Sequence, residues 1–456
     1  MQAILDSIFK AYDVRGRVGE ELSEDVVRRI GAAFGVWLPT QGAVAVGRDM
    51  RPDSAALAAA LIAGLRSVGR DVWDIGEVTS DMIYYAVGAH SLAGGAMVTA
   101  SHNPGEYNGI KFCRDEAQAV GVESGLLDIK QLTLTDQPLA AAEGTLTQKD
   151  VVEGWIDHVL SFVDVDTLKP LKLAVDAGNG MVGKIFPELE PYVPFEVREM
   201  YFELDGTFPN HIANPLEAKN LVDVVAAVRE GACDAGLAFD GDGDRAVLID
   251  ETGEPLSGTV MTALLARYFL QKEPNATILY NAICGQVVPE TIQQLGGTGV
   301  RTKVGHSYIK AEMRARDAIF GGEHSGHYYF RDNYRADSGL LAAVIALAVL
   351  SASDQSLSEL VRPFREAYVQ IPETNFEVAD KAATLDRLKT EFADGDIDEL
   401  DGLTVRLSHG WVNVRPSNTE PLLRLNAEAD SQEALDAMVS RATRVIASSG
   451  ETPYAK

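Results

Sequence analysis

The residues best able to do chemistry lie in two loops, each of which follows a short apolar segment. Ser101 lies in the segment TASHNP at 99–104, directly after the small, apolar residues 94–98. Asp240, Asp242 and Asp244 lie in the segment DGDGDR, after the apolar run 236–239. Active sites of open α/β sheets usually lie at the carboxyl ends of the strands. A hydroxyl on one loop and three carboxylates on the other therefore indicate metal-assisted phosphoryl transfer.

The spacing of the three aspartates predicts a cation site. Carboxylates on a tight glycine loop repel one another unless a cation offsets them, and oxygen ligands suit Mg²⁺. Arg245 follows the loop and could bind the same phosphate as the cation. A calcium EF-hand fits poorly, because Arg245 stands at its sixth position, where the sharp turn needs glycine. A solvated acidic turn is the remaining alternative.

Ser101 has a structural alternative, because serine and asparagine are common turn formers. As a nucleophile or phosphate carrier it needs a metal or a base, and the aspartate loop could supply the metal. We expect the His102 side chain to point elsewhere, since a dyad on consecutive residues is sterically poor. The chain has no G-x-S-x-G elbow, which disfavours a serine hydrolase.

Two later loops could bind a sugar phosphate. Glu323 and Ser325 stand between glycines in the segment 321–327 and could hydrogen-bond sugar hydroxyls; an ordinary polar loop is the alternative. Arg415 opens a segment with a guanidinium fork, hydroxyls and an amide, which indicates a phosphate cradle or a hairpin turn. The polar residues of that cradle are Arg415, Ser417, Asn418 and Thr419, with Arg424 close behind. Near the amino terminus, Arg15 and Arg17 flank Gly16 and could bind phosphate or lie on a solvated loop.

Composition limits the class of protein. The 456 residues predict three or four domains, and the net charge of −27 disfavours nonspecific binding to nucleic acid or an anionic membrane. The three cysteines have no metal-ligand spacing, and no basic-then-apolar signal pattern opens the chain. The longest apolar run is about half the length that spans a bilayer. We expect a cytoplasmic protein.

The elements that must position these loops alternate between helix and strand. Ser23 is expected to cap a helix, residues 8–17 to form a strand-like segment that runs into a basic glycine turn, and the region up to Ser101 to be α/β with mostly parallel pairing. The segment 118–147 is polar and less patterned, and we expect it to lead to a domain boundary. New α/β units begin near 171 and after 255. From about Pro372 strands surround two helices, which predicts an α+β domain.

These loops together resemble the α-D-phosphohexomutase superfamily, over essentially the whole chain and in the expected order. The matching stretches are 11–16, 99–104 with 108–111, 240–245, 322–327 and 415–419. The opening AYDVRG and the loop EHSGH are most similar to the bacterial phosphomannomutase/phosphoglucomutase group. The resemblance implies three successive mixed or parallel-sheet α/β domains and a C-terminal α+β domain around a central cleft. We place them at 1–148, 149–252, 253–368 and 369–456.

The resemblance also implies roles for individual residues. Ser101 would be the phosphoserine and, with the three aspartates, would hold Mg²⁺. Arg245 would contact the transferring phosphoryl group, Glu323 and Ser325 the sugar, and the cradle the non-reacting phosphate. The candidates for proton transfer and electrostatic support are Lys111, Arg15, His306 and His327. Lys111 ranks first because it is expected on the serine's own loop, with a pKa lowered in the closed cleft.

The implied reaction is reversible transfer between the 1- and 6-positions of a hexose phosphate, of mannose and also of glucose. It would run through a hexose 1,6-bisphosphate, which also serves as activator. Alternatives are a phosphoglucosamine mutase, a metal-dependent sugar phosphatase with a transient phosphoserine, and a non-catalytic sugar-phosphate binder. The chain departs from the family pattern at Ile283-Cys284, where some relatives carry a basic residue, and at His324, where Met or Gln is more familiar. A monomer and a homodimer both remain open.

Overall fold

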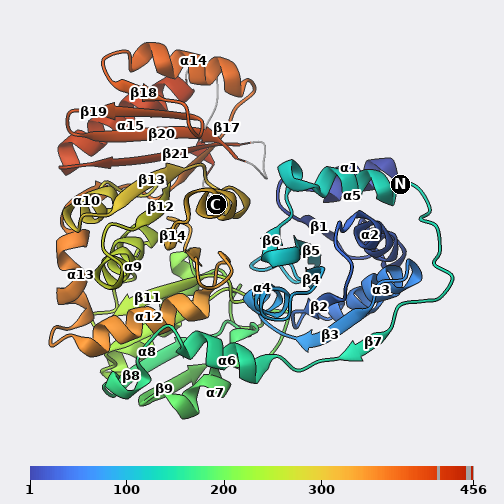
Figure 1. The fold of residues 1–456 in the computed structure, drawn as a ribbon. Helices are drawn as coiled ribbons and strands as arrows, with labels where there is room; N and C mark the ends of the chain where they lie inside the picture. Colours follow the sequence, from blue (N-terminus) through green and yellow to red (C-terminus); the bar gives the residue numbers. More distant parts are fainter. Residues whose placement is uncertain (418–421, 448–452, 455–456) are drawn as a thin grey trace. The chain divides into compact units, whose positions relative to one another are not determined.

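The computed structural model describes residues 1–417, 422–447 and 453–454 (Figure 1). It divides into two compact units. The first contains Met1–Ser257 and Ser325–Leu360, and the second contains Gly258–His324 and Val361–Lys456. Asn418 and Thr419 of the predicted phosphate cradle lie outside the described residues.

The first unit begins with a seven-stranded mixed sheet in the order β1-β5-β4-β2-β3-β7, with β6 paired to β5. The strands are β1 (Val14–Arg17), β2 (Val44–Arg48), β3 (Val72–Glu77), β4 (Gly94–Val98), β5 (Tyr107–Arg114), β6 (Gln118–Ala119) and β7 (Leu146–Gln148). β2 is parallel to β3 and β4, whereas β5 is antiparallel to β4 and β1. β3 is also parallel to β7, so the expected parallel pairing holds from β4 to the β7 edge, and it ends at β5, which brings the chain straight back after the Ser101 turn.

Helices cover both faces of this sheet. They are α1 (Gln2–Ile8), α2 (Glu24–Trp37), α3 (Ser54–Ser67), α4 (Ser80–Ala89) and α5 (Leu126–Thr133). α2, α3 and α5 pack together on one face, over a core that includes Val44, Val46 and Phe112 (Figure 1). α4 covers the other face, where Ile83 and Val87 leave room for no side chain at Gly95. The Ser23 hydroxyl accepts a hydrogen bond from the Val26 amide, as expected for the cap of α2.

One local expectation was wrong, and one segment contains more regular structure than its sequence pattern indicates. Residues 2–8 form helix α1, and Gly16 lies within strand β1 and not in a turn, because β1 pairs along its whole length with β5. The segment 118–147 contains α5 and the short strands β6 and β7. Its apolar residues Leu126 and Ile129 are buried against the helical core, although the surrounding polar residues hide that pattern in the sequence.

A second sheet follows, in the order β11-β10-β8-β9. Its strands are β8 (Leu171–Asp176), β9 (Phe195–Met200), β10 (Ala235–Phe239) and β11 (Ala246–Asp250). Its neighbouring helices are α6 (Val152–Leu160), α7 (Val182–Leu189), α8 (Val222–Gly231) and α12 (Gly339–Ala352). β10 is parallel to β8 and antiparallel to β11, so the aspartate loop is the tight connection of a hairpin. Strand β15 (Tyr328–Phe330) also belongs to this unit.

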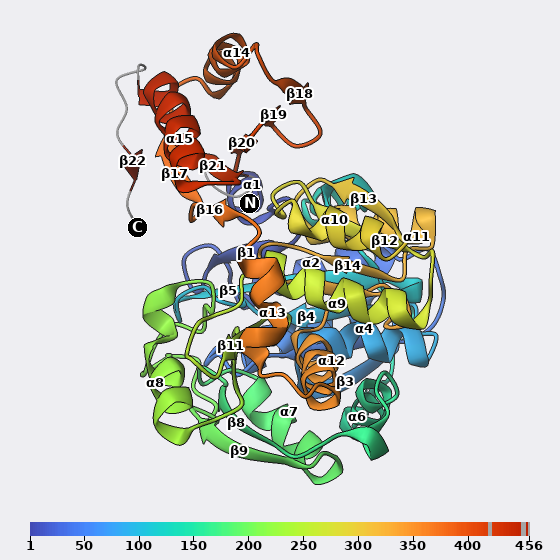
Figure 2. The same cartoon turned by 90° about the vertical axis from the view of Figure 1, so that its left-hand side faces the viewer.

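The second unit contains the parallel strands β13-β12-β14 and an antiparallel terminal sheet. The first group comprises β12 (Thr277–Asn281), β13 (Thr298–Thr302), β14 (Phe320–Gly322), α9 (Gly258–Lys272), α10 (Val287–Gln294) and α11 (His306–Arg316). The terminal strands are β16 (Val369–Gln370), β17 (Thr374–Glu377), β18 (Asp396–Asp398), β19 (Leu403–Leu407), β20 (Gly410–Pro416), β21 (Leu422–Ala429) and β22 (Pro453–Tyr454). α14 (Lys381–Glu391) and α15 (Gln432–Ala447) share the apolar core of that sheet (Figure 2).

No single helix within the described ranges is long and apolar enough to cross a membrane. Together, α12 and α13 (Leu357–Arg365) have the length and apolar composition of a membrane-spanning segment, but the pair is bent by 107°.

Candidate active site

Ser101 is held in a strained, buried turn. Its backbone has φ 51°, the left-handed region that non-glycine residues rarely occupy, and its side chain is buried. The Ser101 amide donates to Thr99 Oγ1 at 2.9 Å, which closes the turn after β4. Strained backbone of this kind persists only where the surroundings fix it.

Arg51 is the residue that fixes the serine turn, and the sequence interpretation missed it. Its guanidinium donates to four backbone carbonyls around the turn, at 2.6–2.9 Å, and pairs with buried Asp49. The carbonyls are those of Ser101, Asn103, Pro104 and Tyr107. A signal was present, because Arg51 follows strand β2 in a glycine- and arginine-containing loop of the type that marked the other sites. Arg15 supports the same turn from β1, since its Nη1 donates to Asn103 Oδ1 at 2.6 Å.

The aspartate loop meets this turn directly. Ser101 Oγ donates to Asp240 Oδ2 at 2.7 Å, and Arg245 Nη2 lies 3.3 Å from the same Oγ. Gly241 permits the approach, because a Cβ there would lie 2.5 Å from the Ser101 carbonyl oxygen. The two loops predicted to work together are therefore in hydrogen-bond contact.

The orientation of the His102 side chain differs from the prediction. Its Nδ1 lies 3.1 Å from Ser101 Oγ and also contacts Arg245 Nη2. Successive side chains point to opposite sides in an extended chain, but the left-handed backbone of Ser101 removes that alternation. Burial and the charge of Arg245 lower the pKa of His102 well below its ordinary value, which favours the neutral ring.

Lys111 lies on β5 and not on the serine loop itself. Its Nζ donates to Asp242 Oδ2 and Asp244 Oδ2, both at 2.6 Å. Although burial favours the neutral amine, the charges of Asp242 and Asp244 raise the pKa of Lys111 well above its ordinary value. This direction is opposite to the expected one, because the expectation did not include two buried carboxylates as neighbours.

The three aspartates fit a divalent cation. Each offers one carboxylate oxygen within 4.8 Å of the others, and all three side chains are buried. Asp242 Oδ1 and Asp244 Oδ1 are buried without a hydrogen-bond partner in the described part of the chain. Leaving carboxylate oxygens buried and unpaired is costly unless a cation or proton compensates them. Burial and the charge of Asp244 raise the pKa of Asp240 to about 7, which again reflects missing positive charge.

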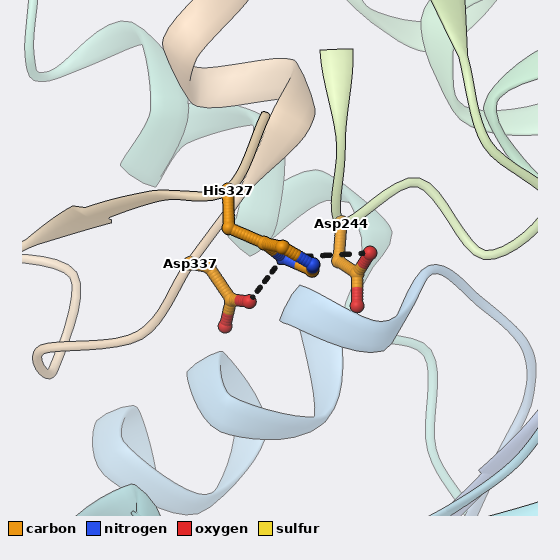
Figure 3. A group of neighbouring side chains, drawn as sticks. All are labelled: Asp244, His327 and Asp337. Atoms are coloured by element: carbon orange, nitrogen blue, oxygen red, sulfur yellow. Dashed lines mark hydrogen bonds and ion pairs between the residues drawn. The ribbon is translucent and has the colours of Figure 1, made fainter. Parts of the chain in front are cut away.

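His327 approaches the same loop from the segment before β15 (Figure 3). Its Nδ1 lies 3.0 Å from Asp337 Oδ2 and 3.8 Å from Asp244 Oδ1. Burial lowers the pKa of His327, but the carboxylates of Asp244 and Asp337 outweigh it and raise the pKa. Asp337 thus orients the ring; it was missed because it stands ten residues beyond His327 in no recognisable motif.

The first compact unit therefore brings together Ser101, Arg15, Lys111, Asp240, Asp242, Asp244, Arg245 and His327, and it also contains Ser325. The second contains the other described candidates, His306, Glu323, Arg415 and Ser417. His306 is the first residue of α11, and the boundary between the units falls between His324 and Ser325.

Within the second unit, Glu323 and Arg415 have defined neighbours. Buried Glu323 accepts a hydrogen bond from Asn281 Nδ2 at 3.1 Å. His324 Nδ1 lies 2.9 Å from Thr259 Oγ1, which accepts from the Gly285 amide. Arg415 lies on β20 and is buried, and the Ser417 amide donates to the Leu422 carbonyl at 2.8 Å.

Comparison with known proteins assigns the family. Four regions match the domains of one family, described as phosphoglucomutase/phosphomannomutase: 6–134 matches alpha/beta/alpha domain I, 153–253 domain II, 257–368 domain III, and 373–445 the C-terminal domain. A relative from Xanthomonas campestris pv. campestris (strain B100), "Phosphohexose mutases", is 42% identical over 94% of this chain and 96% of its own. A "Phosphomannomutase" of Salmonella montevideo is 41% identical over 92% and 94%.

Solved structures agree with these matches. A phosphoglucomutase/phosphomannomutase family protein from Burkholderia thailandensis has a TM-score of 0.90 and 33% identity, covering 98% of this chain and 99% of its own. The chain therefore belongs to the phosphoglucomutase/phosphomannomutase family, the α-D-phosphohexomutases, and is an enzyme of that class with four domains.

Proposed function

We propose that this enzyme interconverts the 1- and 6-phosphates of mannose and glucose, with Ser101 as the residue that carries the phosphoryl group. The contact between Ser101 Oγ and Asp240, beside the guanidinium of Arg245, is the observation that carries the proposal. It joins a hydroxyl that can carry a phosphoryl group to a buried cluster that fits a cation. The domains are proposed at 1–148, 149–252, 253–368 and 369–456.

Ser101, Asp240, Asp242 and Asp244 would hold Mg²⁺. When bound, the cation supplies positive charge to the oxygens of the transferring phosphoryl group. Arg245 adds a guanidinium at Ser101 Oγ, and Lys111 offsets the charge of Asp242 and Asp244. In phosphoryl transfer, positioning and charge compensation of this kind supply most of the catalysis.

In the forward step the bond between the phosphoryl group and Ser101 Oγ breaks as a bond forms to the free hydroxyl of the hexose phosphate. That hydroxyl loses its proton to a base, and the product is a hexose 1,6-bisphosphate. After reorientation, the bond between the other phosphoryl group and its sugar oxygen breaks as a bond to Ser101 Oγ forms. The sugar oxygen takes back the proton held by the base, which releases the hexose phosphate and regenerates the phosphoserine. We propose His327 as the base that accepts this proton, since Asp337 contacts Nδ1 and orients the ring. Arg15, Lys111 and His306 would then provide electrostatic support.

The substrate needs two further contacts. Glu323 and Ser325 would bind sugar hydroxyls, and Arg415 and Ser417, with Asn418 and Thr419, would bind the phosphate that does not react. The reoriented bisphosphate presents its other end to the same cradle, so the cradle must accept either phosphate. The family of the relatives and the donor set of Arg415 support this assignment.

Ser101→Ala tests the proposal. Turnover of mannose 1-phosphate and glucose 1-phosphate, measured with Mg²⁺ and catalytic hexose 1,6-bisphosphate, should fall by about 1,000-fold or more, as when other covalent carriers are removed. Ser440→Ala, an exposed serine on α15, is the matched control and should retain full activity. Undiminished turnover in Ser101→Ala would refute the mutase. Sustained release of inorganic phosphate by the wild type would instead indicate a phosphatase, and preference for glucosamine 1-phosphate a phosphoglucosamine mutase.

A further inference from the structure

The carboxylate of Glu373 lies between two arginines of the terminal sheet. Arg415 on β20 and Arg424 on β21 are direct partners in the antiparallel register. Like charges directly opposite each other on neighbouring strands destabilise a sheet. Glu373, the residue before β17, accepts from Arg415 Nη2 at 3.1 Å through Oε2 and from Arg424 Nη1 at 2.9 Å through Oε1. One carboxylate therefore bridges two guanidinium groups.

The surroundings hold this carboxylate ionised and in place. Asn426 Nδ2 donates to Glu373 Oε2 at 3.1 Å, so three side chains bind the two oxygens. Burial alone would raise the pKa of Glu373, but the charges of Arg415 and Arg424 outweigh it and lower the pKa. The Glu373 side chain is 24% exposed and that of Arg415 only 4%, so the pair is little screened by solvent.

Arg415 keeps hydrogen-bonding capacity beyond this pair. Its Nε is buried and has no hydrogen-bond partner among the residues that the structure describes. Arg415 thus pairs with Glu373 through Nη2 and keeps Nε for a further acceptor. A planar guanidinium fork with such a donor is well suited to phosphate.

We propose that Glu373 is a positioning residue that holds Arg415 in the orientation required for the phosphate of the substrate that does not react. This inference rests on the proposed role of the 415–419 segment and adds a residue to it. A positioning role and a purely electrostatic role of Glu373 predict opposite effects of its removal on phosphate binding. If Glu373 acted by charge alone, its removal would strengthen phosphate binding, because an acid near an anion is unfavourable. If it positions Arg415, its removal weakens phosphate binding.

The variant Glu373→Gln distinguishes the positioning role from the electrostatic role. The KM for glucose 1-phosphate and mannose 1-phosphate should rise about tenfold, the size expected for one charge-assisted hydrogen bond, with kcat changed less than about threefold. Glu377→Gln is the matched control, because Glu377 is an exposed acid on the adjoining strand β17, and its KM should match the wild type. Glu373→Asp keeps the charge but shortens the reach, so its KM should lie between those of the wild type and Glu373→Gln.

The decisive measurement is a double-mutant cycle. In an Arg415→Ala background, Glu373→Gln should change the KM by less than about twofold, because its effect acts through Arg415. A Glu373→Gln KM equal to or below the wild-type value would overturn the proposal, as would an undiminished penalty in the Arg415→Ala background. Failure of the proposed function looks different, since the wild type itself would then not interconvert hexose phosphates. In that case calorimetric binding of glucose 6-phosphate to the same variants still tests Glu373.

Discussion

Two charged clusters of this protein differ in the groups that lie at their centres. Around Ser101 three buried aspartates lie together, and Lys111 and Arg245 pair with them from the side. In the terminal sheet a single carboxylate, that of Glu373, lies between the guanidinium groups of Arg415 and Arg424. Each cluster also contains a buried polar atom without a hydrogen-bond partner in the described ranges, an aspartate oxygen in the first and Arg415 Nε in the second.

The pKa values respond to this difference. Burial among like charges raises the pKa of Asp240 to about 7, whereas the two arginines lower the pKa of Glu373 against the effect of burial. Carboxylates are grouped in the first cluster and guanidinium groups in the second, within a chain whose net charge is −27. Our proposal assigns a cation and the reacting phosphoryl group to the first cluster and the non-reacting phosphate to the second.

Among the substitutions that test this comparison, Asp242→Asn should have the largest effect on activity. Asp242 Oδ1 is one of the two unpaired oxygens, so the substitution removes charge where the cation would bind. We expect Mg²⁺ to bind roughly 100-fold more weakly and turnover at fixed Mg²⁺ to fall at least as far. Titration of activity and of calorimetric heat with Mg²⁺ measures both.

Asp166→Asn is the control for that substitution, because Asp166 is exposed in a short helical turn of the same unit. It should leave the Mg²⁺ affinity unchanged. Equal Mg²⁺ affinity in Asp242→Asn and the wild type would remove the carboxylate cluster from the proposed metal site.

We expect Arg415→Lys to have a smaller effect on activity. Lysine keeps the charge but replaces a planar fork that can bind Glu373 and a phosphate together with a single ammonium group. The KM for hexose phosphates should rise about 30-fold, with a smaller change in kcat. Arg444→Lys on the exposed side of α15 is the control. If Arg415→Lys behaved like the wild type, charge alone would suffice and the geometry of the second cluster would be irrelevant.

The extent to which sequence predicted these clusters depended on distance along the chain. The aspartates and Arg245 share one hexapeptide, and Ser101 lies in another, so local motifs identified them, and the strands before them formed as expected. Arg51 and Glu373 contact groups that lie far away in the sequence. Asp337 contacts His327, which is only ten residues away, but Asp337 lies outside any motif. No local pattern marks such partners, because the sheet register and the packing of helices bring them together. The conformation of Ser101 was missed for the same reason, since Arg51 stabilises it from the loop after β2.

The smallest effect concerns stability, and it follows from the lowered pKa of Glu373. A carboxyl group whose pKa is lower in the folded state stabilises the fold above its unfolded pKa, near the ordinary value of 4.5, and loses that contribution as the pH falls toward the folded pKa. Glu373→Gln removes the ionisable group, so its Tm should lie a few degrees below the wild-type Tm at pH 7 and converge with it as the pH falls below 4.5. Calorimetric scans at several pH values measure the difference, and Glu377→Gln should follow the wild type throughout. A Tm difference that stayed constant with pH would mean that the arginine pair depends on the shape of Glu373 and not on its charge, and the contrast between the two clusters would then be geometric.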